Sequence, residues 1–156
     1  MKGSSLARPP DRCERLNELR EITWRLHLKS PPLAVHAMFT TDSGRERFWA
    51  EKSIERSGQI QFQFIDGLAL TCKILENTSP KRFVFEYFGG SVVTLDLTDD
   101  GVGGTDLTLH ATGVRHAEEW PGWVSVLLAL KAASDYNVDI RNHDAKRTWD
   151  QGYCDN

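Results

Sequence analysis

Hydrophobic and polar residues alternate over much of the chain, and this alternation predicts β-strands. In the first such segment, Ile22, Trp24, Leu26 and Leu28 fall on one face and polar side chains fall on the other. A period of two residues is typical of a strand with one buried face. We therefore expect a first strand over residues 22–29.

A second region of alternation begins after Glu51 and continues for about sixty residues. Its hydrophobic positions predict strands near residues 59–65, 70–74, 83–87, 93–97 and 107–111. Asp66-Gly67, Gly89-Gly90 and the glycine-rich segment 99–104 separate these strands, and such residues are typical of hairpin turns. Together with a strand that starts directly after Glu51, these five segments predict an antiparallel meander of six strands.

Two short helices are predicted between the first strand and the meander. Ser30 precedes Pro31 and Pro32, which is a helix-start signal, and apolar residues follow at helical spacing. A second short helix is expected over residues 42–50.

A long helix is predicted over residues 118–134, after the meander. It is apolar around nearly its whole circumference, which predicts burial on more than one side. One facet carries the short side chains of Ser125, Ala129, Ala132 and Ala133. Short side chains that face a sheet either let the two backbones approach closely or leave unfilled volume, and we favour unfilled volume.

These elements predict one α+β domain, with a curled antiparallel sheet wrapped around the long C-terminal helix. We expect residues 1–20 to form a polar leader and residues 21–135 to form the domain. Residues 136–156 are polar, and we interpret them as a tail that packs on the domain's surface or on a partner. Trp149 and Tyr153 are its expected anchors.

Charge and cysteine content narrow the function classes. The net charge is −3 and the basic residues are scattered, which argues against a nucleic-acid partner. Three widely separated cysteines form no CxxC pair, so we expect neither a metal site nor another cofactor. The sequence shows neither a secretion signal nor an apolar run long enough to span a membrane, and we expect a cytoplasmic protein.

The candidate site is a hydrophobic cavity between the sheet and the long helix. Aromatic and small apolar side chains are the usual lining of such a cavity. The expected lining residues are Trp49, Phe62, Phe64, Phe85, Tyr87, Leu95, Leu109, Trp123, Ser125, Leu128, Ala129 and Ala132. For most of these side chains, a purely structural role in the core is the alternative.

A catalytic alternative requires Glu86, Tyr87 or His110 to reach this cavity and assist proton transfer. Strand alternation instead predicts that Glu86 and His110 point to solvent, because their neighbours in sequence are apolar. No catalytic residue is therefore assigned.

The order of elements over residues 20–134 resembles the helix-grip fold of the SRPBCC (START/Bet v 1-like) superfamily. Within it, the chain is similar to the branch named for activators of the heat-shock-protein-90 ATPase. The motifs that carry this likeness are SPPLAVHAMFTTDSGRERFWAE at residues 30–51 and WPGWVSVLLALK at residues 120–131. Pro31, Phe48 and Trp49 occupy typical places of the first motif, and Pro121-Gly122-Trp123 matches the usual opening of the final helix.

The resemblance implies a domain that encloses a small molecule, since superfamily members bind lipids, hormones and polyketides. We expect non-catalytic binding of a small hydrophobic or aromatic ligand. The alternatives are a cyclase, dehydratase or hydrolase acting on a polyketide-like substrate, and a chaperone-interacting protein. A homodimer is a further expectation.

Overall fold

The computed structural model describes residues 20–156, so the predicted polar leader lies, apart from Arg20, outside the described residues. The described residues begin with strand β1 (Arg20–Leu28), followed by helices α1 (Pro32–Thr40) and α2 (Asp42–Glu46). The later elements are β2 (Lys52–Arg56), β3 (Gln59–Gln63), β4 (Ala69–Thr78), β5 (Arg82–Glu86), the 3-10 turn η2 (Phe88–Gly90), β6 (Val92–Asp99), β7 (Thr105–Val114), helix α3 (Glu119–Tyr136) and the 3-10 turn η3 (Trp149–Gln151).

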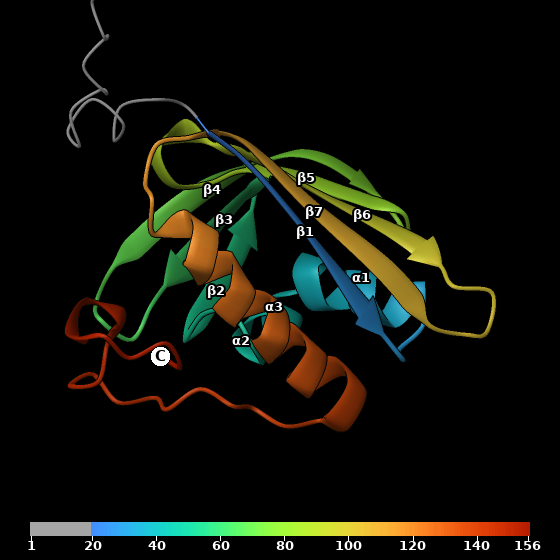
Figure 1. Cartoon of the computed structure of the whole chain (residues 1–156). Helices are drawn as coiled ribbons and strands as arrows, with labels where there is room; N and C mark the ends of the chain where they lie inside the picture. Colours follow the sequence, from blue (N-terminus) through green and yellow to red (C-terminus); the bar gives the residue numbers. More distant parts are fainter. Residues whose placement is uncertain (1–19) are drawn as a thin grey trace, which may run out of the picture.

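All strands belong to one sheet in the order β1-β7-β6-β5-β4-β3-β2, and every neighbouring pair is antiparallel. The six-strand meander and the preceding strand are therefore confirmed. The sheet curls, and α1, α2 and α3 lie on its concave side (Figure 1). The helix-grip arrangement predicted from the order of elements is the observed one.

The core lies between the concave face of the sheet and the helices. Alternate residues of the strands point into it, as the period-two pattern predicts. Those that are 0–1% exposed are Ile22, Leu28, Ile60, Phe62, Cys72, Phe83, Phe85, Val93, Leu95, Leu107, Leu109 and Ala111. The strand faces were thus predicted correctly.

The second helix is shorter than predicted, because α2 ends at Glu46 and residues 47–49 form a turn. In that turn, the carbonyl of Arg45 accepts hydrogen bonds from the backbone N–H groups of Trp49 (2.8 Å) and Ala50 (3.3 Å). The tight turn directs the Trp49 side chain into the core, where it is 5% exposed. Ending α2 early is therefore what places Trp49 at the centre of the molecule.

The orientation of α3 differs from the prediction. Its sheet-facing side carries the large side chains of Trp123, Leu127 and Leu130. Leu128 is 51% exposed on another side of the helix. The expectation of burial on more than one side is wrong. Of the predicted small facet, Ala129 and Ala133 are buried beside these large side chains, whereas Ser125 and Ala132 are half-buried. No helix in residues 20–156 combines the length and apolarity needed to cross a membrane.

Candidate functional site

A pocket of about 740 Å³ opens at the N-terminal end of α3. The start of α3 and the residues just before it form one wall, and four other segments form the rest: the turn after α2, the β3–β4 hairpin, the residues that follow β5, and the C-terminal tail. Its lining residues are Trp49, Ala50, Glu51, Phe64, Ile65, Asp66, Gly67, Leu68, Tyr87, Phe88, His116, Glu118, Glu119, Gly122, Trp123, Ser125, Val126, Arg141, Trp149, Asp150 and Asn156. Several of these, including Leu68 and Glu118, are exposed and form the mouth of the pocket.

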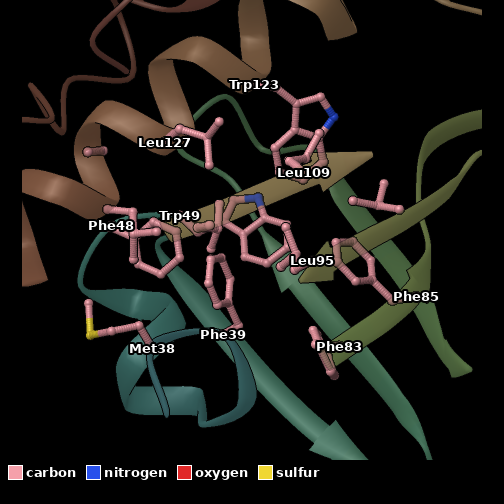
Figure 2. Close-up of a cluster of buried hydrophobic side chains, with 14 of the residues drawn as sticks. Met38, Phe39, Phe48, Trp49, Phe83, Phe85, Leu95, Leu109, Trp123 and Leu127 are labelled. Atoms are coloured by element: carbon pink, nitrogen blue, oxygen red, sulfur yellow. The ribbon is translucent and has the colours of Figure 1, made fainter. Parts of the chain in front are cut away.

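Three aromatic side chains from distant parts of the chain form the inner wall. The ring centroids of Trp49 and Trp123 lie 5.7 Å apart, and those of Tyr87 and Trp123 lie 5.0 Å apart. Trp49 Nε1 donates a hydrogen bond to the Tyr87 hydroxyl oxygen at 3.2 Å. Figure 2 shows Trp49 surrounded by core side chains, with Trp123 and Leu127 descending from α3.

The Tyr87 hydroxyl stays protonated in this setting. Burial raises the pKa of Tyr87, outweighing the opposing hydrogen bond from Trp49, and the nearby Glu119 adds to the increase. A protonated phenol offers an O–H donor to a bound molecule. Tyr87 can therefore donate a hydrogen bond, but it is a poor base.

Glu119 is a buried carboxyl group in the first turn of α3, and its residue is only 7% exposed. Ser91 Oγ donates a hydrogen bond to Glu119 Oε2 at 3.3 Å, while Oε1 has no partner. Burial raises the pKa of Glu119, and both the Ser91 hydrogen bond and the His116 charge oppose that increase. The Nε1 of Trp123, one turn later, is also buried without a partner. Two polar atoms of this wall are thus left unsatisfied, which is uncommon in folded proteins.

The C-terminal tail closes one side of the pocket. It turns back from the end of α3 toward the helix start (Figure 1). Arg141 donates hydrogen bonds to the backbone carbonyls of Glu46 (2.6 Å) and Ala50 (3.0 Å) and pairs with Asp139 at 2.8 Å. His143 lies 2.6 Å from a Glu51 oxygen and 2.8 Å from an Asp139 oxygen. These contacts hold the tail on the domain's own surface.

The contacts between the tail and the domain stabilise the charged forms of the His143 and Asp139 side chains. The hydrogen bond that His143 donates to Asp139 raises the pKa of His143, with burial opposing this increase and Glu51 adding to it. Desolvation acts to raise the pKa of Asp139, but hydrogen bonds from Arg141 and His143 outweigh it and bring the pKa below its usual value. The ionised forms of both side chains are therefore stabilised where the tail meets the domain.

Five of the twelve side chains predicted to line a cavity do line this pocket, namely Trp49, Phe64, Tyr87, Trp123 and Ser125. The other seven lie elsewhere. Phe62, Phe85, Leu95, Leu109 and Ala129 are buried in the core, Ala132 is half-buried, and Leu128 is on the exposed side of α3.

The three proton-transfer candidates are not brought together. Glu86 is exposed at the end of β5, and His110 lies near Glu21, 3.5 Å away, on the sheet face opposite the core. Only Tyr87 of the three lines the pocket. Within residues 20–156, no group of three or more histidine, cysteine or acidic side chains is placed to hold a metal ion. Cys72 is buried, and burial raises the pKa of its thiol to about 12.

Sequence reasoning missed Glu119 and the contribution of the tail to the walls. Glu119 is read from the sequence as a charge favourable to the positive end of a helix, which is normally a solvent-exposed role. Nothing in its neighbours signals burial against Ser91, which comes from the turn before β6. The tail residues carry no hydrophobic pattern that would place them over the pocket.

The sequence matches neither a protein-family model nor a curated protein. Solved structures do resemble the fold. One is the Aha1 protein of Colwellia psychrerythraea, described as a dimer, with a TM-score of 0.67 and 19% identity over 75% of this chain and 97% of that one. Another is an AHSA1-like protein from Aeromonas hydrophila, with a TM-score of 0.62 and 18% identity over 72% and 90% of the two chains.

A third similar structure is DynU16, a protein of the dynemicin biosynthetic locus. Its TM-score is 0.65 and its identity is 17%, over 76% of this chain and 48% of DynU16. These likenesses agree with the strand order, the curled sheet and the position of α3. The chain has an α+β helix-grip fold, similar to the fold of these solved structures.

Proposed function

We propose that this protein binds a small hydrophobic or aromatic molecule in the pocket at the start of α3, without transforming it. The observation that carries the proposal is the pocket itself, whose volume of about 740 Å³ falls in the range usual for small-molecule sites. The Trp49, Tyr87 and Trp123 rings supply an apolar wall. The Tyr87 hydroxyl and the Glu119 carboxyl supply a few polar groups that fix orientation, as is usual in such sites.

The direct test is a substitution in α3 that introduces a large side chain into the pocket. Ser125→Trp places a large ring where a short side chain lines the cavity, and we expect it to weaken binding of the neutral fluorophore N-phenyl-1-naphthylamine at least tenfold, about 1.4 kcal/mol. Leu128→Trp is the matched control, because the same ring is added on the exposed side of the same helix. Dye titration followed by fluorescence measures both affinities.

The control variant should bind the dye like the wild type. Thermal unfolding of both variants establishes that each is folded. If the wild type fails to bind this dye and a panel of other aromatic and lipid-like compounds, the proposal is wrong. Equal binding by both variants would place the dye outside the pocket and contradict the proposed site.

Enzymatic activity and interaction with a chaperone are the alternatives to small-molecule binding. A cyclase-like activity on a polyketide-like substrate now depends on Tyr87, with Glu119 as the nearby carboxyl group, since Glu86 and His110 lie away from the pocket. A raised pKa keeps the Tyr87 hydroxyl protonated, so it can donate a hydrogen bond but is suited neither to accept nor to release a proton. A binding site requires no base at all, which is why we favour binding.

We also propose that the protein forms a homodimer through the exposed side of α3. Trp120, Leu128 and Tyr136 of this helix are each more than 40% exposed. Apolar surface of this kind commonly marks a protein contact, and the similar Colwellia protein is described as a dimer. Light scattering should give a dimer mass for the wild type and a monomer mass for Leu128→Glu. A monomeric wild type would contradict this proposal.

A further inference from the structure

The pocket is lined by more negative than positive groups. Its acidic lining residues are Glu51, Asp66, Glu118, Glu119 and Asp150. Its only guanidinium belongs to Arg141, which already pairs with Asp139 and donates to two backbone carbonyls. Glu51 is partly neutralised by its contact with His143. The remaining charge favours a cationic ligand over an anionic one.

Glu119 adds an observation independent of the charge count. The residue is more than nine-tenths buried, it lines the pocket, and its Oε1 has no hydrogen-bond partner. An unpartnered buried acceptor costs free energy, which a bound donor recovers. The raised pKa of Glu119 has the same origin, because burial disfavours the carboxylate by more than the Ser91 hydrogen bond and the His116 charge favour it.

The aromatic wall complements that carboxyl group. Trp49, Tyr87 and Trp123 lie within 5.8 Å of one another by ring centroid, and Trp123 is one helical turn from Glu119. Ring faces attract a positively charged group, most strongly where water is excluded. An apolar wall beside a buried carboxyl group suits a molecule with a hydrophobic body and one ammonium group.

We propose that the ligand is a hydrophobic amine, whose ammonium group donates a hydrogen bond to Glu119 Oε1 while its apolar body packs on Trp49, Tyr87 and Trp123. This inference rests on the proposed binding function and names the chemical class of the ligand. The ammonium group supplies the hydrogen-bond donor that Glu119 Oε1 lacks, and it places a positive charge beside this carboxyl group. A carboxylate ligand would instead face Glu119 and the acidic mouth at a cost.

The test compares three probes of nearly equal shape that differ in charge: 1-naphthylmethylamine, 1-naphthalenemethanol and 1-naphthoate. Each displaces N-phenyl-1-naphthylamine from the full chain at neutral pH. We expect the amine to bind about tenfold tighter than the alcohol, because hydrogen bonds to a charged group are stronger than neutral ones. The naphthoate should bind more weakly than the alcohol.

Two variants locate the effect. Glu119→Gln keeps the shape of the side chain and removes its charge, so it should bring the amine and the alcohol to similar affinities. Glu86→Gln changes an exposed carboxyl group that does not line the pocket, and we expect it to retain the preference. The comparison among the probes on the wild type stands even if the Glu119 variant fails to fold.

The outcomes separate the two proposals. If the amine is preferred in the wild type and Glu119→Gln removes the preference, both are supported. If the alcohol binds the wild type as tightly as the amine, or if folded Glu119→Gln retains the preference, the inference about amines is wrong and the binding function stands. If neither the dye nor any probe binds the wild type, the proposed function itself fails.

Discussion

Trp49→Ala is expected to lower the free energy of unfolding by about 4 kcal/mol, the range typical of removing a large buried aromatic side chain. Trp49 is 5% exposed, and its ring contacts aromatic rings from α1, β3 and β5 as well as Trp123 of α3. Figure 2 shows how centrally it lies among these side chains. Alanine would leave a cavity that so many fixed neighbours cannot close.

Trp120→Ala is the matched control for this experiment. Trp120 is 45% exposed and makes one edge-to-face aromatic contact, with Trp24 at 5.8 Å. We expect its loss to cost about 1 kcal/mol. Denaturant unfolding measures both values, and dye titration should show impaired binding for the Trp49 variant alone. Equal destabilisation by the two substitutions would contradict the central role assigned to Trp49.

Arg45→Met is expected to lower the free energy of unfolding by about 3 kcal/mol, because it removes several charge-assisted hydrogen bonds at once. The Arg45 side chain is fully buried and donates to the Phe39 carbonyl (2.7 Å) and to Ser53 Oγ (2.7 Å). It also pairs with Asp42 at 2.7 Å and Glu55 at 3.0 Å. These bonds join α1, α2 and β2, and methionine replaces none of them.

Arg82→Met is the control, since Arg82 pairs with Glu76 and Asp96 while its side chain is 44% exposed. Exposed pairs contribute about 0–1 kcal/mol to stability.

The pH dependence of stability is a second test of the Arg45 pairs, measured by denaturant unfolding at neutral and at acidic pH. Desolvation acts to raise the pKa of Asp42, but the Arg45 hydrogen bond and other contacts bring it below its usual 3.8. The Asp42 contribution is therefore full above pH 3.8 and declines as the pH falls through the lower folded value.

The difference in stability between wild type and Arg45→Met should accordingly narrow in acid. If Arg45→Met and Arg82→Met lower the free energy of unfolding equally at neutral pH, the buried Arg45 contributes no more to stability than the exposed Arg82. If the difference in unfolding free energy between wild type and Arg45→Met grows as the pH falls, the assigned pairing of Arg45 with Asp42 is wrong.

The sheet could be predicted from the sequence because strand signals are local. Alternation at residues 59–63 and 83–87 reports which face is buried, and turns such as Asp66-Gly67 mark where the chain reverses. The exposed side of α3 could not be predicted, since a sequence that is apolar all round gives no preferred face. The early end of α2 depends on the backbone turn around Arg45, which has no pattern in sequence.

The candidate site was predictable only in part, because a cavity is the volume that the packed side chains leave unfilled. Aromatic content drew attention to Trp49, Tyr87 and Trp123, which line the pocket, yet the same reasoning included Phe85 and Leu109, which are core residues. Whether a large side chain fills the interior or borders a space depends on partners far away in sequence. The buried setting of Glu119 is likewise a product of tertiary contacts with Ser91.

The docking of the tail has a thermodynamic consequence for the pocket. Arg141 and His143 hold a segment whose Trp149 forms part of the ligand's expected surroundings. Any molecule that contacts both the tail and the helix must then favour the docked state of the tail. By linkage, docking must raise affinity by the same factor. Occupancy of the pocket and protection of the tail from proteases would thus be two measures of one equilibrium.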